Sequence, residues 1–411
     1  MSGLQLVGSL LDPASRADPY PIYARFRGLG PVWIEEMSAA IVSGYDECER
    51  LLRDPRLSAE RWRRTGSVLD GVALPPDTPS SVRQPWFLSQ DPPDHTRLRR
   101  LASRPFTARA VARMEPTIVE LVDGLLDSAA GRDSFDVLAE FAHPLPVTVI
   151  CRMLGVPLAD EPLFRRWSAQ LTRFVDGFTA AVAAPGETPE WAPGLVEMHR
   201  YVNDLIADRR AHPGGEDLIS ALLAAEDGGD ALTHDELVST VVLLLVAGHE
   251  TTVNLIAAGV LALLRHPEQL AALRADPGRA PAVVEEVLRY DPPVQLTARV
   301  TTEDVRIGGL VVPEWSMVIL LLAAAHRDPA ANPDPDRFDP HRAEPRHLGF
   351  GFGPHFCLGA PLARLEGRIA LSRFAQRVRE PKLVLDPPPY RAHVNLRGPS
   401  ELPVAHAGAG G

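Results

Sequence analysis

Apolar residues recur along most of this chain at spacings of three and four, which is the pattern of amphipathic helices. Helices are predicted at residues 21–29, 46–53, 95–102, 108–129, 144–154, 197–211, 217–225, 233–265, 267–275, 281–290 and 358–379. Strand-like runs are few and short, at 32–34, 39–43, 298–300, 311–312 and 317–322. The pattern predicts a mainly α fold with a small β region.

Two stretches, 61–90 and 174–193, follow neither pattern and are rich in proline and glycine. Long irregular segments in a compact domain are often functional loops. No internal repeat or long low-complexity linker divides the chain. We therefore expect residues 1–411 to form a single domain.

The longest predicted helix, 233–265, carries polar residues in an apolar sequence. Thr233 and Glu236 have the spacing of a capping box, and Pro267 ends the pattern. The run from Val241 to Ala247 is apolar on every side, so this helix must be buried. The following Gly-His-Glu-Thr-Thr, 248–252, would cost several kcal/mol in a buried helix unless its polar groups were satisfied. Either this segment has a chemical role, or its glycine and threonines only kink the helix.

Cys357 lies in a glycine-rich segment, LGFGFGPHFCLGAPLARLE, which covers residues 348–366. Glycine allows positive φ angles and a close approach of the backbone to a flat ligand. Backbone N–H groups and the start of the helix that follows would stabilise a thiolate. A buried, inert cysteine is the alternative, and we favour it for Cys48 and Cys151.

Composition narrows the cellular setting. A formal net charge of -11 argues against non-specific binding of nucleic acid. Three cysteines fit a reducing compartment better than a disulfide scaffold. The N-terminal segment resembles neither a secretory signal nor an anchor, and the apolar run 241–247 is far shorter than the roughly 20 residues of a spanning helix. We expect a cytoplasmic protein with neither nucleic-acid nor membrane partners.

The string FGFGPHFCLG, 350–359, matches the haem-binding signature of the cytochrome P450 family, and AGHETT, 247–252, resembles the distal helix of the same family. Matching segments run in the family's order from about residue 15 to 405. The resemblance implies the family's α-rich prism, with haem b between the long helix and the cysteine loop. It also implies that Cys357 is the iron ligand, and that the haem is contacted by Phe350, Gly351 and Gly359.

The resemblance implies roles for further residues. Glu250 and Thr251 would be the acid–alcohol pair that handles protons beside bound dioxygen, and Ala247, one turn earlier, would leave room for dioxygen and substrate. The haem propionates would be bound by His95, Arg99, Arg299 and His355.

Other matching residues would be structural. Glu286 and Arg289 resemble the family's buried ion pair, which an arginine before the cysteine loop completes. Arg337 is our first choice for that arginine, and Arg342 is the alternative. The segment 323–338 resembles the family's approach to this loop, although the family often has Asn where His326 stands.

The implied activity is that of a haem-thiolate monooxygenase that hydroxylates or epoxidises a largely apolar organic molecule. The alanine-, arginine- and proline-rich composition resembles actinobacterial relatives and favours secondary metabolism. Pocket walls are expected from 61–90, 165–196, 292–297 and 394–396. They would include the aromatic residues Phe87, Phe174 and Phe178.

No flavin-binding or iron–sulfur segment is present, so electrons should come from a ferredoxin and its reductase, and we expect a monomer. A basic stretch is a candidate docking face for an acidic ferredoxin: Arg97, Arg99, Arg100, Arg104, Arg109 and Arg113, with Arg364 nearby. Two alternatives remain. One is a haem-thiolate peroxygenase, isomerase or oxidative coupler, and the other is a haem-based sensor or binding protein. The intact Glu250–Thr251 pair favours oxygen activation.

Overall fold

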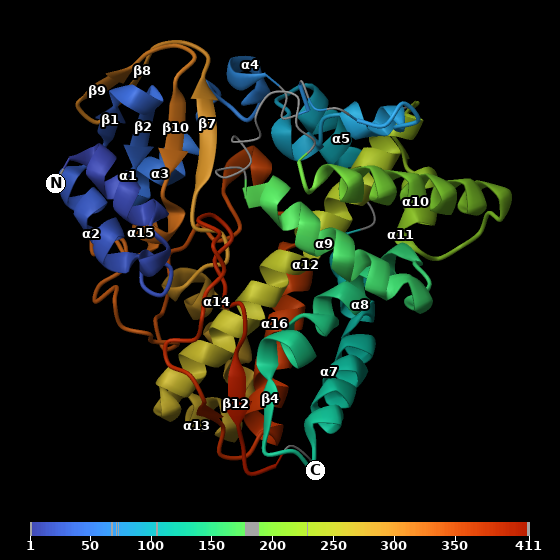
Figure 1. The fold of residues 1–411 in the computed structure, drawn as a ribbon, viewed down its shortest axis with the longest axis vertical. Coiled ribbons are helices and arrows are strands. Elements are labelled where there is room, and N and C mark those ends of the chain that lie inside the picture. Colours follow the sequence, from blue (N-terminus) through green and yellow to red (C-terminus); the bar gives the residue numbers. More distant parts are fainter. Residues whose placement is uncertain are drawn as a thin grey trace. The chain divides into compact units, whose positions relative to one another are not determined.

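A computed structural model describes residues 2–66, 69–70, 72, 74–103, 106–176, 189–227 and 229–408 (Figure 1). The chain forms two compact units. The first unit contains Met1–Ser58, Met114–Leu145 and Thr251–Gly411. The second contains Ala59–Arg113 and Pro146–Glu250.

The first unit combines helices with most of the strands. Its helices are α1 (Gly3–Leu11), α2 (Tyr20–Leu29), α3 (Tyr45–Leu51), α7 (Glu115–Ala129), α13 (Pro267–Ala275), α14 (Ala280–Tyr290), α15 (Leu322–His326) and α16 (Ala360–Arg377). A five-stranded sheet has the order β1 (Val32–Ile34), β2 (Ala39–Val42), β10 (Met317–Leu320), β7 (Thr297–Thr301) and β3 (Leu57–Ser58). A second sheet has the order β11 (Lys382–Leu383), β12 (Pro403–Ala405) and β4 (Ser134–Asp136), and β8 (Val305–Ile307) pairs with β9 (Leu310–Val312).

The five-stranded sheet supports one side of the cysteine loop. Strand β10 is parallel to β2 and antiparallel to β7, with Val318 opposite Arg299. Ala298 and Val300 are buried, whereas Arg299 between them is half-buried, because successive side chains of a strand point to opposite faces. Val318 shares a hydrophobic core with Leu348, the residue that begins the cysteine loop. The sheet therefore positions both the Arg299 side chain and the start of the cysteine loop.

The second unit is almost entirely helical. It contains α4 (Trp62–Thr65), α5 (Asp94–Ser103), α6 (Ala108–Arg113), α9 (Glu161–Asp176), α10 (Ala192–Ala211), α11 (Leu218–Leu223) and the short pair β5 (Glu226–Asp227) and β6 (Asp230–Ala231). Part of the irregular 61–90 segment is tied to the helices. The Ser81 Oγ lies 3.0 Å from His199 Nδ1 on α10, and Ser239 donates to the Gln84 carbonyl at 3.2 Å.

Two helices cross the boundary between the units: α8 (Pro144–Leu154) and the 32-residue α12 (His234–Arg265), which is about 48 Å long. The predicted capping box of α12 is present, since Thr233 N–H donates to Glu236 Oε2 at 2.9 Å and Glu236 N–H donates to Thr233 Oγ1 at 3.3 Å. Among the residues described, α12 alone is long and apolar enough to cross a membrane, but 83% of its most apolar window is buried inside the protein. It is therefore a core helix by its packing.

The predicted fold class is confirmed, and the main errors concern boundaries. The helix predicted over 108–129 breaks into α6 and α7 because Pro116, which has no N–H to donate, begins a new helix. Helices α1, α4, α9 and α15 and several two- or three-residue strands were not predicted, and the strand predicted over 317–322 ends at Leu320, two residues before α15 begins. Such short strands carry too few residues to show an alternating pattern.

Candidate functional site

The cysteine loop presents the thiol of Cys357 at the surface of its unit. Cys357 is exposed, whereas Cys48 and Cys151 are buried. Gly351 and Gly353 both have φ of 71°, a left-handed conformation that favours glycine. The Cys357 N–H donates to the Phe350 carbonyl at 2.8 Å and closes the loop. The two glycines thus allow the turns that bring the cysteine back over Phe350.

Helix α16 begins directly after the thiol. Gly359 caps the helix, and a Cβ added to Gly359 would lie 3.9 Å from Cys357 Sγ. The partial positive charge at the start of a helix stabilises a neighbouring anion and so favours the thiolate form of cysteine. The local structure therefore suits a sulfur ligand to a metal centre.

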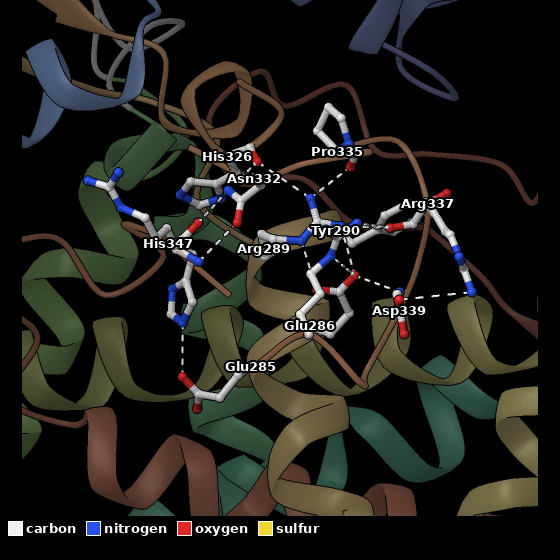
Figure 2. A network of polar contacts seen from close by, with 12 residues as sticks. Glu285, Glu286, Arg289, Tyr290, His326, Asn332, Pro335, Arg337, Asp339 and His347 are labelled. Atoms are coloured by element: carbon white, nitrogen blue, oxygen red, sulfur yellow. Dashed lines mark hydrogen bonds and ion pairs between the residues drawn. The ribbon is translucent and has the colours of Figure 1, made fainter. Parts of the chain in front are cut away.

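A buried ion pair supports the segment that leads into the loop (Figure 2). Arg289 and Glu286, both on α14, are completely buried, and Arg289 donates to both carboxylate oxygens of Glu286 at 2.7 Å. The remaining donors of Arg289 bind the carbonyls of Pro335 (2.7 Å), Arg337 (2.9 Å) and His326 (3.4 Å). One side chain of α14 therefore holds three points of the segment before the cysteine.

The choice of Arg337 as the third member of this cluster was wrong, and Arg342 takes that place. Arg342 Nε lies 3.3 Å from Glu286 Oε1, and only 12% of its side chain is exposed. The side chain of Arg337 is 64% exposed and lies 3.9 Å from Asp339. Arg337 instead contributes its backbone carbonyl, because the chain turns its side chain away from α14 at this point.

The buried surface of helix α12 is interrupted by accessible residues within the segment 247–252. Ala247 is exposed and Thr251 is half-buried, although most residues around them are buried. These two residues are four apart, so they share one face of the helix. Glu250 is 6% exposed, and His249 Nδ1 lies 2.8 Å from the Leu245 carbonyl, to which it must donate. The sequence thus places a buried carboxyl beside an accessible alcohol.

The predicted propionate ligands are divided between the units. Arg299 on β7 and His355 in the cysteine loop are half-buried in the first unit. Arg299 Nη1 donates to Thr297 Oγ1 at 3.2 Å and to the Ala298 carbonyl at 2.9 Å. His95 is buried and Arg99 half-buried on α5 of the second unit. A thiol together with cationic N–H donors is a donor set that fits haem iron and its two carboxylates.

Two buried polar residues, Glu366 and Asn254, were not identified from the sequence. Glu366 on α16 is 1% exposed, burial raises its pKa to about 8, and its Oε2 has no hydrogen-bond partner among the described residues. Asn254 on α12 is fully buried, and neither atom of its amide has a partner within the described part of the chain. A Cβ added to Gly398 would lie 2.1 Å from Asn254 Oδ1. Both residues are polar positions in otherwise apolar helix faces, and this pattern could have identified them from the sequence.

Two of the predicted pocket segments lie together in the first unit. Val294 and Leu396 form an antiparallel bridge, and the Gln295 N–H donates to the Asn395 carbonyl at 2.9 Å. Phe87 is buried in the second unit, with its ring 6.4 Å from that of His95. Phe178 and the side chain of Phe174 lie outside the described residues.

The expectation that the basic stretch faces outward needs correction. Arg97 pairs with Glu236 and, at 3.3 Å, with Asp230, so its charge is used within the unit. Arg364 is likewise paired, at 2.6 Å from Glu285. Arg109 and Arg113 are exposed, as is Arg100, which lies 3.9 Å from Asp230. Arg104 lies outside the described residues.

The α-rich fold, the buried α14 pair and the exposed loop thiol define a haem-thiolate type of protein, and comparison with known proteins agrees. The family model for Cytochrome P450 matches residues 77–389. Cytochrome P450 monooxygenase PikC of Streptomyces venezuelae is 43% identical over 400 residues, which cover 94% of this chain and 91% of that protein. The 6-deoxyerythronolide B hydroxylase of Saccharopolyspora erythraea is 39% identical, with 97% and 98% covered.

Solved structures give the same result. Ligand-free CYP164A2 of Mycobacterium smegmatis superposes with a TM-score of 0.88 at 49% sequence identity, covering 98% of this chain and 99% of that chain. The chain belongs to the cytochrome P450 family. It is therefore an oxidoreductase of the haem monooxygenase class, and its cofactor is iron protoporphyrin IX.

Proposed function

We propose that Cys357 is the residue that would ligate the haem iron and that the chain is a dioxygen-activating monooxygenase of an apolar organic molecule. The observation that carries this proposal is the exposed Cys357 thiol, closed into a glycine loop at the start of α16. Haem with a thiolate ligand supplies reductive activation of dioxygen and cleavage of its O–O bond. The protein supplies ligation, proton delivery and exclusion of side reactions.

Proton delivery falls to α12. Thr251 is half-buried, and its hydroxyl would donate a hydrogen bond to an oxygen species bound at the haem, while the neighbouring buried carboxyl of Glu250 would supply the proton. Ala247, one turn away on the same face, leaves space for dioxygen and substrate. Phe350, Gly351 and Gly359 are the loop residues that contact the haem.

Four residues with N–H donors would hold the haem propionates, and they are His95, Arg99, Arg299 and His355. Cationic N–H donors form the shorter, stronger class of hydrogen bond with carboxylates. Residues 1–411 would then form a single haem-binding domain.

The substrate is a largely apolar small molecule, which the enzyme hydroxylates or epoxidises in bacterial secondary metabolism. The names of PikC and of 6-deoxyerythronolide B hydroxylase support an oxygen-inserting reaction. A related structure, CxnD, at 36% identity, is described as an enzyme for C–S bond formation in chuangxinmycin biosynthesis. A coupling reaction is therefore the second candidate, and it shares the early steps of oxygen activation.

Electrons come from a separate ferredoxin and ferredoxin reductase, and the enzyme acts as a cytoplasmic monomer without nucleic-acid or membrane partners. The formal net charge is -11, and Arg109 and Arg113 are among the exposed positive charges of the chain. Such charges steer an acidic protein partner.

The reduced carbon monoxide complex tests the ligand. Wild type should show the red-shifted band of thiolate ligation, and Cys357→His should lose this band while retaining iron. If Cys357→His kept the band unchanged, the assignment of the ligand would be wrong. A library of apolar compounds screened for a shift of the haem absorption band on binding would then identify the substrate class, and turnover with a surrogate ferredoxin would separate hydroxylation from coupling.

A further inference from the structure

One carboxylate of α14 joins the two ends of the cysteine loop. Glu285 Oε2 accepts a hydrogen bond from His347 Nε2, just before the loop, at 2.9 Å (Figure 2). The same carboxylate accepts from Arg364, just after the loop, through Nε at 2.6 Å and Nη2 at 2.9 Å. Residues 347 and 364 are 17 positions apart, so Glu285 closes the intervening segment into a ring.

Two imidazole rings hold consecutive amides where the loop begins. His347 Nε2 faces a carboxylate and must carry the proton, so Nδ1 is the acceptor that receives the Gly349 N–H at 3.2 Å. His326 Nε2 accepts the Leu348 N–H at 2.7 Å. Burial lowers the pKa of His326 well below 6.5, and the nearby Arg289 guanidinium lowers it further, so this ring stays neutral at neutral pH. The backbone conformation at the start of the loop is therefore held by two imidazole nitrogens that accept hydrogen bonds from the Leu348 and Gly349 amides.

At the other end of the loop, Arg364 contacts Phe350, the residue whose carbonyl accepts the backbone hydrogen bond of Cys357. The Arg364 guanidinium lies 4.5 Å from the centre of the Phe350 ring. The Phe350 carbonyl accepts the Cys357 N–H at 2.8 Å. Burial of Glu285 opposes its charge, but hydrogen bonds from Arg364 and His347 hold its pKa at about 2. The Glu285 carboxylate is therefore ionised at neutral pH and pairs with the Arg364 guanidinium.

We propose that Glu285, His347 and Arg364 are positioning residues for the Cys357 thiolate, forming a clamp that fixes the direction of the sulfur from both ends of its loop. This inference rests on the proposed ligation of haem iron by Cys357. Residues that orient a metal ligand without touching the metal typically change affinity or activity by about 10–100-fold when they are removed. A simple surface ion pair would have almost no effect on the ligand.

The chain offers a matched control on the same helix. Arg368, one turn after Arg364, pairs with Glu115 at 2.6 Å, and both pairs are partly exposed. Glu285→Gln and Glu115→Gln each remove one carboxylate charge from an arginine of α16. Only Glu285 also contacts the loop, through His347.

The test follows the reduced carbon monoxide complex of each holoenzyme and, in parallel, hydrogen exchange of a peptide covering 345–357. We expect the thiolate band to decay roughly tenfold or more faster in Glu285→Gln than in wild type, with faster exchange in the peptide, and both to stay near wild type in Glu115→Gln. Equal behaviour of the two variants in both measurements would overturn the clamp. A wild type without the thiolate band would instead count against the ligation by Cys357, and the exchange measurement would still decide the clamp.

A second pair of variants separates positioning from simple packing. His347→Asn keeps a side-chain acceptor for the Gly349 N–H, whereas His347→Phe keeps ring volume and removes the acceptor. We expect the band of His347→Asn to be the more stable of the two. If His347→Phe were equal to His347→Asn or better, the accepting nitrogen would have no positioning role and the proposal would fail.

Discussion

Removal of either partner of the Glu286–Arg289 pair should abolish haem incorporation and not merely slow the reaction. In Glu286→Ala, the fully buried guanidinium of Arg289 loses both carboxylate hydrogen bonds and keeps only backbone carbonyls as acceptors. In Arg289→Ala, the buried carboxylate keeps the Asp339 N–H at 2.7 Å and Arg342 at 3.3 Å. Each change leaves a buried charge poorly compensated.

The expected cost follows from this burial. Breaking a buried ion pair by removing one partner typically costs about 3–5 kcal/mol. The total stability of a folded protein is only about 5–15 kcal/mol. Because Arg289 also binds the carbonyls of Pro335 and Arg337, its loss additionally releases the segment before the cysteine loop. Arg289→Ala should therefore affect haem content at least as severely as Glu286→Ala.

The assay is the ratio of haem to protein in the purified variants, together with unfolding by denaturant. The double variant Glu286→Leu with Arg289→Met removes both charges and should recover part of the stability, since no charge remains unpaired. The partly exposed pair Glu47–Arg50, also three residues apart on a helix and with a 4.0 Å separation, provides the control, and Glu47→Ala should cost at most about 1 kcal/mol. Full haem content and near-normal stability of Glu286→Ala would refute the reasoning from buried charge.

Three further outcomes are expected. Thr251→Ala should bind haem and substrate normally but release more hydrogen peroxide per NADPH consumed, and an unchanged ratio of product to NADPH would remove Thr251 from proton delivery. Because burial raises the folded-state pKa of Glu366 to about 8 from an ordinary 4.5, its stability contribution is complete below pH 4.5 and is lost as pH rises through 8. Glu366→Gln should therefore be more stable than wild type at pH 9, by up to about 5 kcal/mol at 1.36 kcal/mol per pKa unit, and a parallel pH profile of unfolding in the two proteins would contradict this. The double variant Arg109→Glu with Arg113→Glu should slow reduction by an acidic ferredoxin most strongly at low salt, and an unchanged rate across the salt range would place docking elsewhere.

Sequence patterns were most informative where one long element or one dense motif fixed the outcome. Helix α12 was predicted to within one residue, because its capping box and terminal proline mark both ends. The break between α6 and α7 was missed, although Pro116 was visible, because the apolar spacing continues across it.

The arginine of the buried cluster shows a different limit. Arg337 and Arg342 lie in the same irregular segment, and nothing in their spacing tells which side chain turns inward. Which arginine turns inward depends on the backbone turns at 333–339, where the Pro335 and Arg337 carbonyls accept hydrogen bonds from Arg289. The outward orientation of Arg97 and Arg364 was likewise overestimated, since their partners Glu236 and Glu285 are distant in sequence.

The three cysteines differ in how readily each can be oxidised. Burial raises the pKa of Cys151 to about 12 and that of Cys48 still further, so neither forms a reactive thiolate at neutral pH. Cys357 is exposed and stands at the start of a helix. Thiolate character and access are the two properties that govern oxidation to sulfenic and then irreversible acids. Among the three cysteines, oxidation should therefore concentrate on Cys357 wherever its thiol is open to solvent. Peroxide treatment should modify Cys357 before Cys48 and Cys151, and mass spectrometry of the three cysteine peptides would show the order.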